Sequence, residues 1–205
     1  MGVSAHLPPR SATQIPWSVA TPLAANVKVA PKLCARGTAM KGVGKFGEIM
    51  AGEHGTASYD EALAKLQKVA RSGSAPKAIL DFTCKELRRM LPHYTWVGVY
   101  RVEDATLVLQ AWAGPAATQH TRIPVGEGLC GLAARTGATV IAPDVHTDSR
   151  YLACFVSTNA EIVVPIARDG TIVGGIDVDS DTRDAFSAND RTLLEALATE
   201  LAPVL

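Results

Sequence analysis

Cys154 lies in a long segment, residues 143–158, that shows neither helical nor strand periodicity. Connections longer than about 12–15 residues are uncommon in compact domains and are often functional. Two aromatic residues, Tyr151 and Phe155, flank the cysteine in this segment. A thiolate attacks electrophilic atoms whereas the protonated thiol does not, so a cysteine in a functional loop is a candidate nucleophile. We therefore expect Cys154 to carry out thiol chemistry.

Three carboxylates follow Cys154 along the chain. Asp177 and Asp179 are two residues apart in an apolar stretch, so they project from one face if that stretch is a strand. Glu161 begins the preceding apolar stretch and is expected close to them. Two carboxylates on one face repel each other, which is tolerated where they bind a cation or an ammonium group or share a proton. The alternative is that the two aspartates lie at a solvated strand end without function.

Two aromatic residues, Trp96 and Tyr100, are four apart in an alternating stretch rich in aromatic and β-branched residues, which predicts a strand. They share a face of that strand and belong either to the core or to the wall of a site; the spacing by itself favours the core. Cys84 lies in a predicted helix and is expected to be buried. His93 and His120 are expected at the surface.

No metal site is expected. None of the four cysteines forms a CxxC pair, which argues against both a structural zinc site and a disulfide scaffold. His146 and Asp148 stand in the long segment, but two residues without matched partners are poor evidence for a metal. Cys34 lies in the N-terminal stretch and is not expected to take part.

The overall composition excludes several classes of function. The formal net charge of zero argues against a nucleic-acid or anionic-membrane partner. No run of 18 apolar residues is present, so no transmembrane helix is expected. A chain of 205 residues suffices for one sizeable domain with an appendage.

The first 47 residues differ from the rest of the chain, because they hold six basic residues, no acidic residue and five of the twelve prolines. No sustained periodicity is present. We interpret residues 1–50 as a disordered extension or as sequence upstream of the true start, with Met40 and Met50 as later start positions. The alternative is an organellar transit peptide, since the stretch is basic and free of acidic residues.

The elements that position these candidates follow from periodicity. Helices are predicted over 58–71, with Ser58 and Glu61 as a capping box, over about 76–90, over 129–136 and after Ser187, which is expected to form an N-cap with Asp190. Strands are predicted over 94–100, 106–111, 121–125, 139–142, 161–167 and 171–178. Asp-Gly at 169–170 is a strong hairpin signal. The order predicts an α+β domain over 58–205, with a central antiparallel sheet, helices on one face and a pocket covered by loops.

Several motifs resemble, in order and spacing, those of the GAF-domain free methionine-(R)-sulfoxide reductases over roughly residues 59–201. The motifs are Trp96-Val-Gly-Val-Tyr100, Arg122-Ile-Pro-Val-Gly-Glu-Gly-Leu-Cys130-Gly, Ala142-Pro-Asp-Val-His146, Ala153-Cys154, Asn159-Ala-Glu161-Ile-Val-Val-Pro165 and Gly175-Ile-Asp177-Val-Asp179-Ser180. The resemblance implies a GAF fold and the reduction of free methionine-(R)-sulfoxide to methionine.

The resemblance also implies roles for individual residues. Cys154 falls at the catalytic cysteine and Cys130 at a second cysteine of the family. Carboxylates that hold the substrate ammonium group and the sulfoxide oxygen fall at Glu161, Asp177 and Asp179, and pocket aromatics fall at Trp96 and Tyr100. The family usually has a third cysteine, which resolves the sulfenic acid as a disulfide, but here His120 stands at that position. Cys130 or an external thiol is then expected to resolve it.

These residue types suit a thiol-dependent reduction. A carboxyl group with a pKa raised by a neighbouring carboxylate can protonate the departing sulfoxide oxygen near neutral pH. Cys154 is left as a sulfenic acid, which a second thiol converts to a disulfide. We expect no cofactor, an external dithiol reductant such as thioredoxin, a homodimer, and a cytoplasmic location unless the N-terminal stretch directs import into an organelle. The alternatives are a non-catalytic GAF module that binds a small molecule, favoured by the missing cysteine, and a regulatory dimerisation subunit.

Overall fold

The computed structural model describes residues 56–205. All of them belong to the second of two units into which the chain divides, Ile49–Leu205. The predictions for residues 1–50, for Cys34 and for a transit peptide lie outside the described residues. Among the helices of residues 56–205, none has both the length and the apolar character needed to span a bilayer.

The described part is built on one six-stranded antiparallel sheet in the order β3-β2-β1-β6-β5-β4. The strands are β1 (Trp96–Glu103), β2 (Thr106–Ala113), β3 (Arg122–Pro124), β4 (Val140–Ala142), β5 (Ala160–Arg168) and β6 (Thr171–Ser180). The predicted antiparallel α+β architecture is therefore confirmed.

Two tight turns join the hairpins. Asp169 and Gly170 both have positive φ between β5 and β6, as the Asp-Gly signal predicts for a type I′ turn. Between β1 and β2 the positive-φ residues are Asp104 and Ala105, which form the turn between the two strands.

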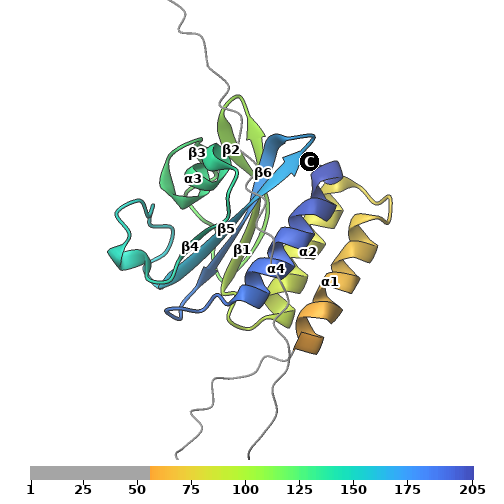
Figure 1. Ribbon diagram of the computed structural model, residues 1–205, viewed down its shortest axis with the longest axis horizontal. Coiled ribbons are helices and arrows are strands. Elements are labelled where there is room, and N and C mark those ends of the chain that lie inside the picture. The colour runs from red at the N-terminus through yellow and green to blue at the C-terminus, as the bar shows by residue number, and fades with distance from the viewer. Residues whose placement is uncertain (1–55) are drawn as a thin grey trace, which may run out of the picture. The chain divides into compact units, whose positions relative to one another are not determined.

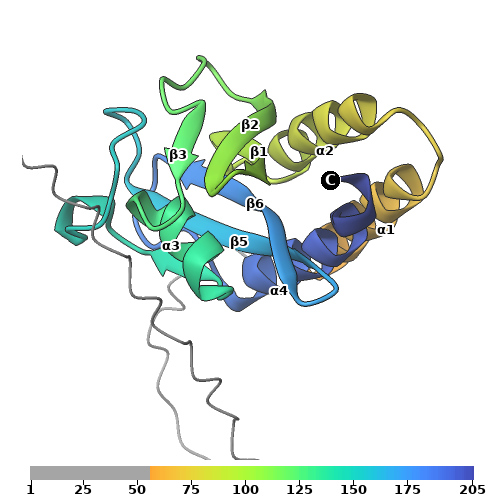
Figure 2. The ribbon, with the colours of Figure 1, turned by 90° about the horizontal axis from the view of Figure 1, so that it is seen from above.

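Three long helices cover one face of the sheet, and a short helix lies on the other (Figures 1 and 2). The long helices are α1 (Thr56–Ala70), α2 (Pro76–Met90) and α4 (Ala188–Leu201), and the short one is α3 (Gly128–Thr136). The prediction of helices on one face holds for the long ones. Single-turn 3₁₀ segments occur at Val145–Thr147 and Ala202–Val204.

The helix ends show where local signals succeed. Ser187 and Asp190 form the predicted capping box of α4, with the Ser187 side chain accepting from the Asp190 backbone N–H at 3.4 Å. The capping box predicted at Ser58 is wrong, because α1 begins at Thr56 and Ser58 lies within its first turn. Polar residues inside a helix can mimic a cap signal.

The two faces of the sheet carry separate apolar cores. The larger core lies between the sheet and the long helices and contains Cys84, which is fully buried as predicted. The smaller core lies between the sheet and α3, and it contains Trp96, Tyr100 and Cys130. The candidate site residues therefore gather on the face opposite the long helices.

Candidate functional site

Strand register brings the three predicted carboxylates together. Glu161 on β5 is paired directly with Asp179 on β6, and Asp177 lies two residues away on the same face. Their side chains are 4%, 1% and 2% exposed, in the order Glu161, Asp179, Asp177. The interpretation of the aspartates as a solvated strand end is therefore wrong, whereas the prediction that they share a face with Glu161 nearby is confirmed.

Burial leaves these carboxylates short of partners. Neither carboxylate oxygen of Asp179 accepts a hydrogen bond from the described residues, and neither does Oδ1 of Asp177. Burial raises the pKa of Asp177 to about 6. Burial, followed by the charge of Asp177, raises the pKa of Glu161 and that of Asp179 well above their usual values. Unpartnered buried carboxyls are destabilising when they are ionised, and they favour a ligand that brings a positive charge or a shared proton.

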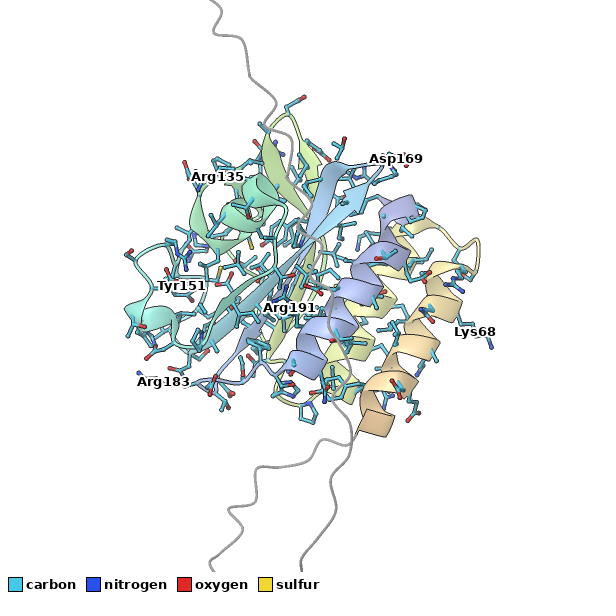
Figure 3. All side chains as sticks on the ribbon, viewed as in Figure 1. Lys68, Arg135, Tyr151, Asp169, Arg183 and Arg191 are labelled. Atoms are coloured by element: carbon cyan, nitrogen blue, oxygen red, sulfur yellow. The ribbon has the colours of Figure 1, made fainter. Side chains whose placement is uncertain are left out.

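Cys154 lies half-buried in the segment between β4 and β5, on the same side of the sheet as α3; Tyr151, labelled in Figure 3, marks that segment. The Cys154 Sγ is 3.3 Å from Nδ1 of His120, and it donates to the Leu152 carbonyl oxygen at 3.5 Å. Burial raises the pKa of the Cys154 thiol, and the nearby carboxylates Asp177, Asp179 and Glu161 raise it further.

Cys130 lies in the first turn of α3 and is buried. The Cys130 Sγ is 3.9 Å from Oε1 of Glu161, the acceptor of its thiol hydrogen, and burial raises the pKa of this thiol well above its usual value. Cys130, Cys154 and Glu161 line one small, partly open cavity, which is completed by Ile123, Gly128, Leu129 and Leu152. Two thiols and a carboxyl group thus open into a single space.

The two predicted aromatic residues are buried on the same face. The Trp96 indole stacks on Trp112 with ring centroids 6.5 Å apart, and it lies 6.0 Å from the ring of Phe155, next to Cys154. The Tyr100 hydroxyl donates to the backbone carbonyl of His120 at 3.0 Å. Both residues therefore belong to the smaller core and also border the loops that hold Cys154, so the two alternatives drawn from their spacing are compatible.

Close approach of Trp96 to the sheet requires glycine at two positions. A Cβ on Gly98 would lie 2.3 Å from Cη2 of the indole, and a Cβ on Gly114 would lie 2.1 Å from its Cδ1. The ring therefore lies flat on backbone that has no side chains.

Within residues 56–205, one group of side chains brings potential metal-ligating atoms together. One atom each of Cys130, Glu161 and Asp177 can be chosen so that all lie within 4.8 Å of one another. Thiolate with two carboxylates is a donor set that a divalent ion could use. His146 and Asp148 do not converge, because His146 bonds to the Asn159 side chain at 3.1 Å while Asp148 pairs with Arg150.

Two histidines differ from their predicted surface positions. His93 lies 2.7 Å from the buried Asp190, far from the site on the helical side. His120 contacts Cys154 and is the site residue whose role the residue pattern missed. No local signal marks it, because the two residues are 34 positions apart and meet only through the fold; its place at the position of a family cysteine was the sole indication.

The comparisons with known proteins agree with this geometry. A family model described as GAF domain matches residues 73–205. The "Free methionine-R-sulfoxide reductase" of Escherichia coli is 37% identical over 128 residues, which cover 62% of this chain and 76% of that protein. A solved structure of a free methionine-R-sulfoxide reductase from Neisseria meningitidis in complex with its substrate is 35% identical, with a TM-score of 0.67 over 71% of this chain and 87% of that one. A solved structure of a type II free methionine-R-sulfoxide reductase from Thermoplasma acidophilum is 40% identical, with a TM-score of 0.60 over 68% of this chain and 94% of that one.

Proposed function

The chain belongs to the GAF-domain free methionine-(R)-sulfoxide reductase family, and on that premise we propose that it reduces free L-methionine-(R)-sulfoxide to methionine. The observation that carries the proposal is the cavity shared by Cys154, Cys130 and Glu161 beside the paired aspartates. It combines a nucleophile, a second thiol and acidic groups, which are the parts that a thiol-dependent sulfoxide reduction needs.

In the proposed reaction, the Cys154 thiolate attacks the sulfur of the sulfoxide while the sulfoxide oxygen gains a proton. The attack forms a transient bond between Sγ and the substrate sulfur, and this bond and the S–O bond break as the oxygen is transferred to Cys154. The sulfoxide sulfur is reduced by two electrons to the thioether of methionine, and the thiol is oxidised to a sulfenic acid, the first reversible step of cysteine oxidation. A carboxyl group that stays protonated near neutral pH is suited to donate a hydrogen bond to that oxygen and polarise the S–O bond, and raised pKa values support this role for the carboxyl cluster.

The carboxylates also supply selectivity. An α-ammonium group of a free amino acid would provide the positive partner that the buried oxygens of Asp177 and Asp179 lack. A methionine sulfoxide within a polypeptide has an uncharged amide at that position and would leave the site carboxylates without a cation. Trp96 and Tyr100 are proposed to wall the pocket around the methyl group of the substrate.

The oxidised enzyme must then be recycled. We propose that Cys130 attacks the sulfenic sulfur, so that an S–S bond forms and water leaves, and that an external dithiol such as thioredoxin reduces the disulfide. The proposed steps use side chains of the chain itself and no prosthetic group. A reducing compartment such as the cytoplasm suits this cycle, and a homodimer is the expected assembly.

The test is incubation of the reduced protein with free methionine-(R)-sulfoxide and dithiothreitol, followed by quantification of methionine. We expect methionine from the (R) epimer, none from the (S) epimer, and little from a peptide that contains methionine sulfoxide. Comparable turnover of peptide and free amino acid would contradict the role of the carboxylates. Saturable binding of the free sulfoxide with no methionine formed would favour the alternative, a non-catalytic GAF module.

A further inference from the structure

We propose that His120 is a catalytic residue that takes the proton from Cys154 and returns it to the departing sulfoxide oxygen. The inference deepens the proposed function and rests on it for the identity of the substrate. It also gives a role to the residue that replaces the usual resolving cysteine, since an imidazole cannot form a disulfide but can activate a thiol.

The first argument is contact. The Nδ1 atom of His120 lies 3.3 Å from the Cys154 Sγ, within the range of a hydrogen bond to sulfur. Cys154 Sγ also donates to the Leu152 carbonyl oxygen at 3.5 Å, an oxygen that only accepts, and a hydrogen bond from the Thr118 side chain lowers the pKa of the thiol. A carbonyl acceptor stabilises the thiol form. The imidazole can instead accept the proton and then donate to the thiolate from the same atom.

The second argument is that His120 is held in place from both sides. Its backbone N–H donates to the Thr118 hydroxyl at 3.1 Å, and its carbonyl accepts from the Tyr100 hydroxyl at 3.0 Å. Thr118 and Tyr100 are both buried, at 5% and 1% exposure. These contacts fix the backbone of His120 beside the site, and the contact of its ring with Cys154 Sγ sets the ring direction.

The third argument concerns charge. The acidic groups that face the Cys154 thiol are Glu161, Asp177 and Asp179 from the sheet, together with Tyr100 and the Cys130 thiol. Each of them in its ionised form disfavours a thiolate, because like charges repel. A thiolate paired with an imidazolium avoids that repulsion, since the pair is neutral overall. His120 is therefore placed where the reaction requires a positive charge.

The chemical steps balance without a further reagent. The proton of the Cys154 thiol moves to Nδ1 of His120, which gives a thiolate and an imidazolium. The thiolate attacks the sulfoxide sulfur and forms a transient S–S bond, and the imidazolium returns the proton to the sulfoxide oxygen. The S–S and S–O bonds of this adduct then break as the hydroxyl moves to Sγ. Methionine and the Cys154 sulfenic acid result, and His120 is neutral again.

The experiment measures the reactivity of Cys154 without substrate. Full-length reduced protein is alkylated with iodoacetamide from pH 5.5 to 9.5, and labelling of the Cys154 peptide is followed by mass spectrometry. Wild type is compared with His120→Ala, with His120→Asn, which keeps a donor near the Nδ1 position but cannot take up a proton, and with His146→Ala, which removes an exposed histidine of the Cys154 segment.

We expect the midpoint of the Cys154 profile to rise by about one pH unit in both His120 variants, which is about a tenfold lower alkylation rate at neutral pH. His146→Ala should match wild type. A purely structural role would lower the rates evenly and leave the midpoint in place. Identical midpoints in wild type and in folded His120→Asn would overturn the proposal. A shifted midpoint in a protein that forms no methionine would uphold the pair and refute the proposed function alone.

Discussion

Glu161 and Asp179 are directly paired across β5 and β6, and both carboxyls are buried. Such a pair of like groups is destabilising when ionised, and Asp177 adds a third acid on the same face. Burial raises the pKa of each of the three, that of Asp177 to about 6. The folded protein therefore binds protons here more tightly than the unfolded chain, which links stability to pH.

The first prediction is that this cluster makes the protein less stable as the pH rises. An acid with a raised folded pKa contributes stability that is present below its unfolded pKa, near 4, and is lost as the pH rises through the folded pKa. Asp190 has the opposite shift, because hydrogen bonds from His93 and Ser187 outweigh its burial and lower its pKa to about 2, so its effect is confined to pH below about 4. From pH 4 to 7 the free energy of unfolding should fall.

Asp179→Asn should reduce the fall in the free energy of unfolding between pH 4 and 7, and it should also lower activity. Removing one acid relieves repulsion, whereas losing a partner to the substrate ammonium should raise KM by about 5- to 150-fold, since such a loss costs about 1–3 kcal/mol. Urea unfolding at pH 5 and pH 7 and initial rates with the free amino acid check both effects. Asp169→Asn, at the exposed hairpin tip labelled in Figure 3, is the matched control. Parallel pH profiles for wild type and Asp179→Asn would contradict the prediction.

The second prediction separates the described cysteines by face. Cys154→Ser should abolish methionine formation. Cys84→Ala should keep it, because Cys84 lies in the core under the long helices and burial raises its pKa to about 12, which leaves its thiol protonated. Methionine is quantified after turnover with dithiothreitol, and thermal unfolding shows whether each variant is folded. Equal loss in two folded variants would rule out Cys154 as the specific nucleophile.

Much of the fold was predictable because local signals and the final structure agree. The Asp169-Gly170 turn adopts the positive φ angles that its residue types favour, and the Ser187 cap starts α4 where expected. The predictions fail where the rest of the fold overrides a local sequence signal. Ala105 adopts positive φ, which alanine disfavours, so only the strand register places the first hairpin turn there.

The candidate site was predictable in part for the same reason. The two-residue spacing of Asp177 and Asp179 fixes their common face, and the hairpin brings Glu161 beside them. Their burial was open, since no local pattern distinguishes a covered strand end from a solvated one. The contact of His120 with Cys154 joins two irregular segments. The positions of such segments depend on tertiary packing, which leaves no periodic pattern in the sequence from which the contact could be predicted.

The third prediction concerns the space beneath Trp96. Gly98→Ala would place a methyl group 2.3 Å from the indole, so the ring must shift, while the extended backbone tolerates alanine. Overpacking of this kind costs about 1–3 kcal/mol, and we expect lower thermal stability together with a higher KM. Gly175→Ala on β6 is the control, because its Cβ would have ordinary contacts at 3.6 Å or more. An unchanged KM in Gly98→Ala would show that the indole does not shape the pocket.

The fourth prediction concerns how the Cys154 sulfenic acid is resolved. Cys130 lines the same cavity as Cys154, and its thiol faces Glu161, which can take its proton and pass it to the leaving hydroxyl group as the new S–S bond forms, so that water leaves. Cys84 lies on the other face of the sheet. Because a disulfide requires the two Cα atoms to lie within about 7 Å of each other, we expect Cys130 and not Cys84 to be the partner of Cys154.

Treatment with stoichiometric free methionine-(R)-sulfoxide, without reductant, should therefore yield a Cys130–Cys154 disulfide. Peptide mapping by mass spectrometry detects the link, and Cys130→Ser should instead leave a sulfenic acid that dimedone traps. The variant should still form one equivalent of methionine, because resolution follows the reduction of substrate. An unlinked Cys130 in oxidised wild type would mean that an external thiol resolves Cys154, so that the replacement of the family cysteine by His120 makes turnover depend directly on the reductant.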